Sequence, residues 1–169
     1  RVHVREGVEA DDLIASTALS LGKGREALVL SADKDLLQVL SPGVRVMRPQ
    51  KGVSEFRLFD EALFREEYGF APSAMADYLA LTGDAVDHIP GVAGIGDKGA
   101  RALVSHHGSL EGIYAHLGEL PKGQRGKLEE GREQAFASRA LVVPLPTEAI
   151  PAEGLIPAPR DDERARTLC

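Results

Sequence analysis

The chain has 169 residues, 43% hydrophobic and 27% charged, which is the composition of an ordinary soluble globular domain. Its single cysteine, Cys169, excludes an intrachain disulfide, and the absence of any run of about 18 apolar residues excludes a membrane span, so we expect a cytoplasmic protein. The net charge of −6 excludes a uniformly basic nucleic-acid binder, but residues 88 to 127 hold five Lys or Arg against three Asp or Glu, a local basic excess.

The first third of the chain alternates helix and strand patterns. Residues 10 to 21 carry apolar side chains at helical spacing, with Gly22 placed to end the helix. EALVLSADKD (26 to 35) predicts a short apolar strand that ends in two aspartates and continues as a helix. This alternation predicts an α/β fold with a partial parallel sheet, in which ligand sites lie beyond the carboxyl ends of the strands.

A hairpin and two helices are expected next. VRVMR (44 to 48) and SEFRLF (54 to 59) alternate with a period of two and predict a hairpin around Gly52. Asp60 is a candidate N-cap for a helix that ends at Gly69. Pro72 suits the first turn of the following helix.

From Thr82 onward the sequence predicts helices joined by glycine-rich turns, with no further strand before residue 150. Gly108 is expected to end one helix and Ser109 to cap the next. A final helix is expected from about Gln124 to Arg139. The proline-rich segment after it is typical of an extended strap or a frayed tail.

Acidic residues gather in three groups at the ends of these elements, within GVEADDLIA, LSADKDLLQ and LTGDAVDHIPG. Any single acid is better explained as a helix cap, so only their joint occurrence favours a common site. Brought together, they would repel one another unless divalent cations neutralised them, and oxygen ligands favour magnesium or manganese over zinc. The candidate metal ligands are Glu9, Asp11, Asp12, Asp33, Asp35, Asp84 and Asp87.

A glycine-rich turn follows the third acidic group, in IPGVAGIGDKGARALV (89 to 104). Glycines before a helix let a phosphate approach the backbone, and the free N–H groups of the helix then supply donors. The pattern indicates a helix-hairpin-helix, although on bare spacing a purely structural turn would be as good an explanation. The candidate DNA-binding residues are Gly91, Val92, Gly94, Ile95, Gly96, Lys98 and Arg101. We divide the chain into an α/β core (1–83), a helix-hairpin-helix region (84–145) and an extended tail (146–169).

Over roughly residues 5 to 145, the three acidic motifs and the hairpin resemble, in order and interval, the flap-endonuclease and 5′-3′-exonuclease family, which includes the 5′-nuclease domain of bacterial DNA polymerase I. The resemblance implies that the acids hold two Mg²⁺ or Mn²⁺ ions, with Asp33, Asp35, Asp84 and Asp87 catalytic. It also implies that the turn binds duplex DNA, with a K⁺ ion held by backbone carbonyls. One departure is Val86-Asp87-His88, where relatives typically have Ser-Asp-Asn.

The implied function is hydrolysis of phosphodiester bonds near DNA 5′ ends and flap junctions during replication and repair, close to the nucleoid. Family members carry an Asp-bearing strand and a basic arch upstream of the point that matches Arg1, so we expect a piece of a longer protein that is weak or inactive alone. The resemblance also makes a polymerase, fused or separate, a candidate partner. The alternatives are a non-catalytic DNA-binding fragment and a carboxylate-rich phosphatase unrelated to nucleic acid, which would leave the hairpin unexplained.

Overall fold

The computed structural model describes residues 2–21, 24–50 and 55–155. The expected helix end at Gly22 and the turn at Gly52 lie outside these ranges, as does the tail beyond residue 155. The strands are β1 (Ala27–Leu30), β2 (Val44–Pro49) and β3 (Phe56–Phe59). The helices are α1 (Ala10–Leu21), α2 (Glu61–Tyr68), α3 (Met75–Thr82), α4 (Asp97–His107), α5 (Leu110–Ala115), α6 (Lys122–Glu130) and α7 (Arg132–Val142). Short 3₁₀ helices are η1 (Asp35–Val39), η2 (Pro72–Ala74), η3 (Leu117–Glu119) and η4 (Ala152–Leu155).

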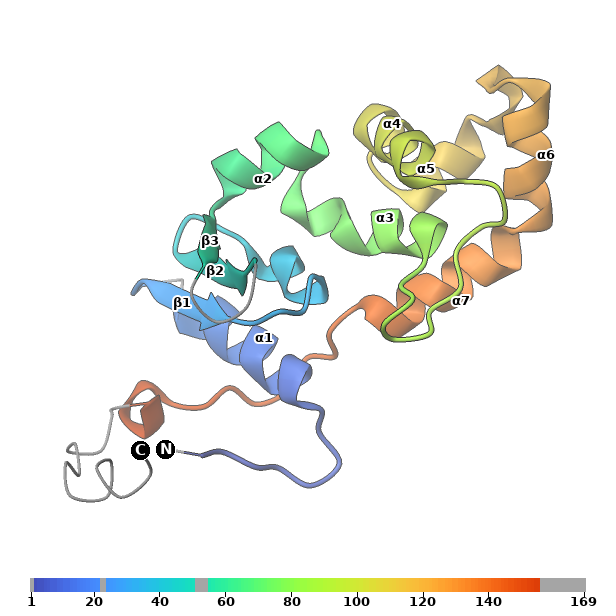
Figure 1. Cartoon of the computed structure of the whole chain (residues 1–169). Coiled ribbons are helices and arrows are strands. Elements are labelled where there is room, and N and C mark those ends of the chain that lie inside the picture. The colour runs from blue at the N-terminus through green and yellow to red at the C-terminus, as the bar shows by residue number, and fades with distance from the viewer. Residues whose placement is uncertain (1, 22–23, 51–54, 156–169) are drawn as a thin grey trace.

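The described strands form one sheet in the order β1-β2-β3. β1 is parallel to β2, with Val29 opposite Val46, and β2 is antiparallel to β3, with Val46 opposite Phe59. This confirms the partial parallel sheet and the pairing of the two alternating segments. Helix α1 packs beside β1 and η1, and its Ala15 and Ala18 belong to the buried core (Figure 1).

Helix α2 begins and ends at the residues that the sequence predicts. The carboxylate of Asp60 accepts a hydrogen bond from the Leu63 N–H at 2.8 Å, and Gly69 ends the helix at φ 82°, where glycine has no side-chain penalty. Ser109 caps α5 in the same manner through the Gly112 N–H.

Helix α3 joins the sheet-bearing part to the helical part. It packs on η1 on one side and on α4 and α7 on the other, and Leu79, Ala80 and Leu81 are fully buried. One continuous set of buried side chains therefore runs from the sheet into the helices. Between Thr82 and residue 150 the described chain has no further strand, as expected. The structure thus has an α/β part followed by a helical part (Figure 1).

The single final helix expected from Gln124 to Arg139 is wrong, because the chain breaks at Gly131 into α6 and α7. A Cβ atom on Gly131 would lie 2.7 Å from Cγ1 of Val92, a buried side chain of the glycine-rich turn. The missing side chain of Gly131 therefore leaves room for Val92 at the break between the two helices.

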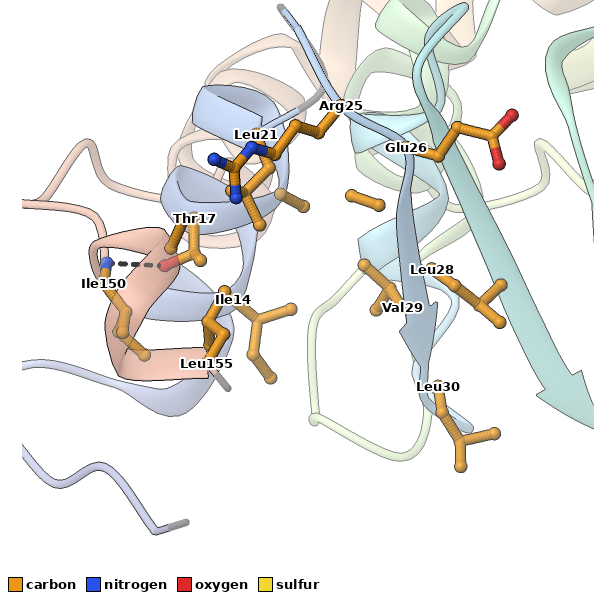
Figure 2. Close-up of a pocket in the computed structure, with 13 residues that line it drawn as sticks. Ile14, Thr17, Leu21, Arg25, Glu26, Leu28, Val29, Leu30, Ile150 and Leu155 are labelled. Atoms are coloured by element: carbon orange, nitrogen blue, oxygen red, sulfur yellow. Dashed lines mark hydrogen bonds between the residues drawn. The ribbon is translucent and has the colours of Figure 1, made fainter. Parts of the chain in front are cut away.

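After α7 the chain runs back along α1 as an extended strap, residues 143–155 (Figure 1). Backbone N–H groups of Leu145, Thr147 and Ile150 donate hydrogen bonds to the side chains of Asp12, Ser16 and Thr17. Part of the strap, with α1 and β1, lines a cavity of about 580 Å³ (Figure 2). The expected strap is thus present up to residue 155. Among the described residues, no helix combines the length and apolar character required to cross a bilayer.

Candidate metal centre and nucleic-acid interface

Three carboxylates meet beyond the carboxyl end of β1. Oxygen atoms of Asp33, Asp35 and Asp87 all lie within 4.8 Å of one another. The turn after β1 aims the first two, since the Asp33 N–H donates to Oγ of Ser31 at 3.0 Å and the Asp35 N–H donates to Oδ1 of Asp33 at 2.8 Å. Asp87 comes from the loop after α3, so the expected convergence of two distant acidic groups is present.

The cluster makes its own ionisation unfavourable. Burial, followed by the charges of Asp33, Asp84 and Asp87, raises the pKa of Asp35 to about 7. Oδ1 of Asp35 is buried and has no hydrogen-bond partner among the described atoms. The pKa of Asp11 is raised to about 6 by burial and then by its contact with the Asp33 carboxylate. A cation bound among these oxygens would remove this penalty.

Asp84 has a different environment from the three clustered carboxylates. Only 3% of it is exposed, and its carboxylate pairs with Nζ of Lys34 at 2.8 Å and accepts the Val86 N–H at 2.8 Å. Burial acts to raise the pKa of Asp84, but the Lys34 ammonium and backbone N–H donors outweigh it and lower the pKa. Asp84 therefore holds the start of the loop that presents Asp87. The sequence analysis did not select Lys34. Its position between Asp33 and Asp35 was the only sequence feature that pointed to a role at this site.

The remaining two acids lie at the start of α1. Oδ1 of Asp12 accepts the Leu145 N–H at 2.7 Å, so this carboxylate faces the strap. Glu9 is exposed, and its charge contributes to the raised pKa of Asp11. The structure does not bring either acid into the three-carboxylate cluster, and their metal-binding roles stay predictions.

The loop that carries Asp87 closes through two glycines and one strained residue. Backbone hydrogen bonds join Asp84 and Ile89 in both directions at 2.8 Å. Gly83 has φ 73°, and a Cβ atom on Gly91 would lie 2.6 Å from its nitrogen, so the chain needs both glycines to cross itself here. His88, at the departure from the relatives' motif, has φ 56°, in the left-handed region where asparagine is more at ease.

The glycine-rich turn presents its backbone while its apolar side chains enter the core. Val92 and Ile95, both candidate DNA-binding residues, are only 3% and 7% exposed, so only their backbone groups could reach a ligand. Gly96 precedes α4 in an extended conformation, and the space where its Cβ would stand is open. A groove beside the helix start is lined by Gly94, Ile95, Gly96, Asp97, Lys98, Gly99, Gln124 and Lys127.

Arg101, another candidate, is half-buried and held by contacts within the protein. Its Nε donates to Asp97 at 2.7 Å, its Nη1 donates to the Glu67 carbonyl at 2.6 Å, and its guanidinium lies 4.4 Å from the ring centre of Tyr68. The Tyr78 hydroxyl also donates to Asp97 at 2.6 Å, and the hydrogen bonds from Tyr78 and Arg101 lower the pKa of that carboxyl. This network ties α4 to α2 and α3. Lys127 and Gln124, which sequence reasoning missed, line the groove instead.

Helix α7 links the hairpin to the carboxylate cluster. Oγ of the fully buried Ser138 donates to the Pro90 carbonyl at 2.6 Å, and Nε2 of Gln38, in η1, donates to the Val142 carbonyl at 2.7 Å. Both candidate sites are therefore attached to the same helix.

Family models match nearly the whole described chain. Residues 1–69 match the N-terminal resolvase-like domain of 5′-3′ exonucleases, and residues 70–149 match their C-terminal SAM fold. The chain belongs to the 5′-3′ exonuclease family. The chain is 41% identical over 142 residues to the flap endonuclease Xni of Salmonella typhimurium, covering 83% of itself and 55% of that protein. It is 38% identical over 135 residues to a 5′-3′ exonuclease of Bacillus subtilis, covering 80% and 46% respectively. The chain thus spans about half the length of the curated relatives it matches.

Solved structures agree with this family. The bacteriophage T5 5′-exonuclease with bound zinc ions superposes with a TM-score of 0.71 at 25% identity, over 83% of this chain and 51% of the phage chain. The T5 flap endonuclease in a pseudo-enzyme-product complex with DNA and metal ions gives a TM-score of 0.71 at 24% identity, over 83% and 51%, and shows the shared fold.

Proposed function

We propose that this chain carries the carboxylate cluster and the duplex-binding hairpin of a metal-dependent 5′-nuclease, which hydrolyses DNA near 5′ ends and flap junctions. The observation that carries the proposal is the meeting of Asp33, Asp35 and Asp87 within 4.8 Å beside a hairpin that opens onto a helix start. The names of the relatives, a flap endonuclease and a 5′-3′ exonuclease, support this reaction.

The residues present fit a hard divalent cation. Carboxylate oxygens are the ligands that Mg²⁺ and Mn²⁺ prefer, and the unpartnered Oδ1 of Asp35 is a free ligand atom within the cluster. Asp33, Asp35 and Asp87 would hold the ions, with Asp11 close by, and Asp84 with Lys34 keeps the loop in place. When bound, two such ions activate water and stabilise the leaving oxygen in phosphodiester hydrolysis.

The substrate in this proposal is duplex DNA with a 5′ end or flap. The open helix start at Gly96 and the exposed Lys98 supply backbone donors and a positive charge for a phosphate. Such contacts read the shape of the duplex and not its sequence. With this substrate, we propose that the protein acts in DNA replication and repair near the nucleoid, alongside a polymerase. The K⁺ ion that the resemblance implies would need the hairpin carbonyls, and Gly94 already uses its carbonyl to accept a hydrogen bond from Nζ of Lys127.

The metal site is tested by titrating Mn²⁺ into the full chain and into Asp35→Asn, by calorimetry. We expect Asp35→Asn to weaken Mn²⁺ binding by about tenfold or more. Asp60→Asn is the matched control, because it makes the same chemical change at a helix cap outside the cluster. Equal Mn²⁺ affinity in all three proteins would refute the metal centre. Duplex binding without any Mn²⁺ binding would favour the non-catalytic DNA-binding fragment.

A further inference from the structure

We propose that Lys127 supplies a built-in cation at the hairpin, in place of a bound K⁺ ion, and contacts a DNA phosphate beside the start of α4. The inference rests on the proposed duplex-binding function and names a residue and a cation requirement for it. The observation behind it is that Nζ of Lys127, from α6, donates a hydrogen bond to the carbonyl of Gly94 at 3.1 Å.

Gly94 is shaped to receive this lysine. A Cβ atom on Gly94 would lie 2.8 Å from Cε and 3.0 Å from Nζ of Lys127, so any larger residue would displace the ammonium. Gly94 also has φ 78°, which disfavours other residues independently. The glycine thus brings a cation from a distant helix onto the hairpin.

Several carbonyls of the turn already accept hydrogen bonds from the protein. The Pro90 carbonyl accepts the hydroxyl of Ser138, and the Val92 and Gly96 carbonyls accept the N–H groups of Ile95 and Ala100. A K⁺ ion on the Gly94 carbonyl would share it with an ammonium, and two unit charges about 4 Å apart repel by about 1 kcal/mol even in water and by more near a protein surface. A K⁺ ion at this turn would therefore have to compete with the Lys127 ammonium for the Gly94 carbonyl.

The ammonium is also available to an anionic ligand. Lys127 is exposed, and no carboxylate pairs with it in the described part of the chain. Asp97 is the one acid that lines the groove, and its carboxylate accepts hydrogen bonds from Tyr78 and Arg101. Lys98 and Lys127 therefore supply the positive charge of the groove, while Arg101 serves the fold.

The test measures duplex affinity by fluorescence anisotropy, in EDTA and over a series of salt concentrations, for the full chain, Lys127→Met and Lys122→Met. Losing one phosphate contact should flatten the log–log salt slope by about 0.9 and weaken binding about three- to tenfold at 0.1 M salt. Lys122→Met, on the same exposed helix but outside the groove, should bind within about twofold of the unmodified chain. Thermal unfolding of each variant confirms that it is folded.

A second arm replaces K⁺ with tetramethylammonium at constant ionic strength. The unmodified chain should keep its affinity for duplex DNA, because the ammonium of Lys127 is part of the protein and does not depend on K⁺ in solution. Loss of affinity on K⁺ removal, or an unchanged slope in Lys127→Met while the unmodified chain binds duplex, would overturn the inference alone. An unmodified, folded chain that binds no duplex would overturn the proposed DNA-binding function together with it.

Discussion

Asp35 links the stability of the protein to pH. Its pKa is raised from 3.8 to about 7, first by burial and then by the neighbouring Asp33, Asp84 and Asp87. Because the folded-state pKa lies above the unfolded value, the protonated group contributes stability that is fully present below about pH 4 and is lost as the pH rises through about 7. At pH 8, metal-free protein with an ionised Asp35 should therefore be less stable than the same protein with a neutral side chain at this position.

We expect Asp35→Asn to raise the melting temperature of metal-free protein at pH 8 by at least about 2 °C, which corresponds to about 1 kcal/mol for a chain of this size. At pH 4 the difference should shrink, because both proteins then carry a neutral group. Calorimetric melting at the two pH values, with Asp60→Asn as the control, measures this. A variant that is less stable than the unmodified chain at pH 8 would contradict the raised pKa.

His88 tests whether the loop beside Asp87 is strained. Its φ of 56° is tolerable for histidine or asparagine and costly for a β-branched residue. We expect His88→Asn to stay within about 0.5 kcal/mol of the unmodified chain and His88→Val to lose about 1–2 kcal/mol in urea unfolding. Equal stability of the two variants would mean that the loop adopts another conformation in solution.

At the scale of elements, the crossing of Gly83 and Gly91 sets the position of the Asp87 loop. A Cβ atom on Gly91 would lie 2.5 Å from the carbonyl carbon of Thr82, with backbone atoms that cannot give way cheaply. We expect Gly91→Ala to destabilise the protein by about 2 kcal/mol or more and to weaken Mn²⁺ binding by displacing Asp87. The control is Gly99→Ala inside α4, where the nearest atom is 3.9 Å away and helix propensity favours alanine by about 1 kcal/mol.

Asp12 distinguishes a structural role from a metal ligand. An asparagine retains an oxygen that can accept the Leu145 N–H, whereas alanine does not. If the carboxylate serves the strap, Asp12→Asn should keep both stability and Mn²⁺ affinity, and Asp12→Ala should lose about 1 kcal/mol. Unfolding and Mn²⁺ titration of both variants give the result. Weaker Mn²⁺ binding by the Asp12→Asn variant would show that the Asp12 carboxylate is a metal ligand.

Local sequence patterns predicted most of the helices and strands. The features that they did not predict depend on contacts between distant parts of the chain. Asp60 and Gly69 mark the ends of α2 because capping is a property of the chain near each residue. The contact of Gly131 with Val92, at the break between α6 and α7, joins residues far apart in the chain, and no local pattern reveals it. The pairing of Lys34 with Asp84 and the seat of Lys127 on Gly94 are likewise contacts between distant segments. The motifs therefore indicated the carboxylates and the hairpin but not the two lysines.

At the scale of the whole molecule, β1 leaves one edge unpaired and an apolar face exposed in the described structure. Leu28 and Leu30 are 53% and 62% exposed and border the cavity between α1 and β1 (Figure 2). β1 pairs only with β2 within the described residues, so its other edge can pair with another chain. We expect this chain to associate as its concentration rises, by light scattering after size exclusion.

Leu30→Lys should reduce that association by placing a charge on the exposed apolar face beside the open edge. Leu141→Lys, a comparably exposed position on α7, is the matched control and should leave it unchanged. A chain that stays monomeric at high concentration would show that the exposed surface of β1 does not mediate self-association.

Helix α7 connects the hairpin to the carboxylate cluster at a fixed distance. One of its residues, Ser138, holds the hairpin at Pro90, and its last residue, Val142, is held by Gln38 from the 3₁₀ helix that starts at Asp35. In the proposed nuclease, one helix attached to both the hairpin and the carboxylate cluster would set the length of duplex between them. In the proposed nuclease, the cut would then fall at a constant number of nucleotides from the gripped phosphate, whatever the bases, because the measure is taken by the protein and not by the DNA sequence.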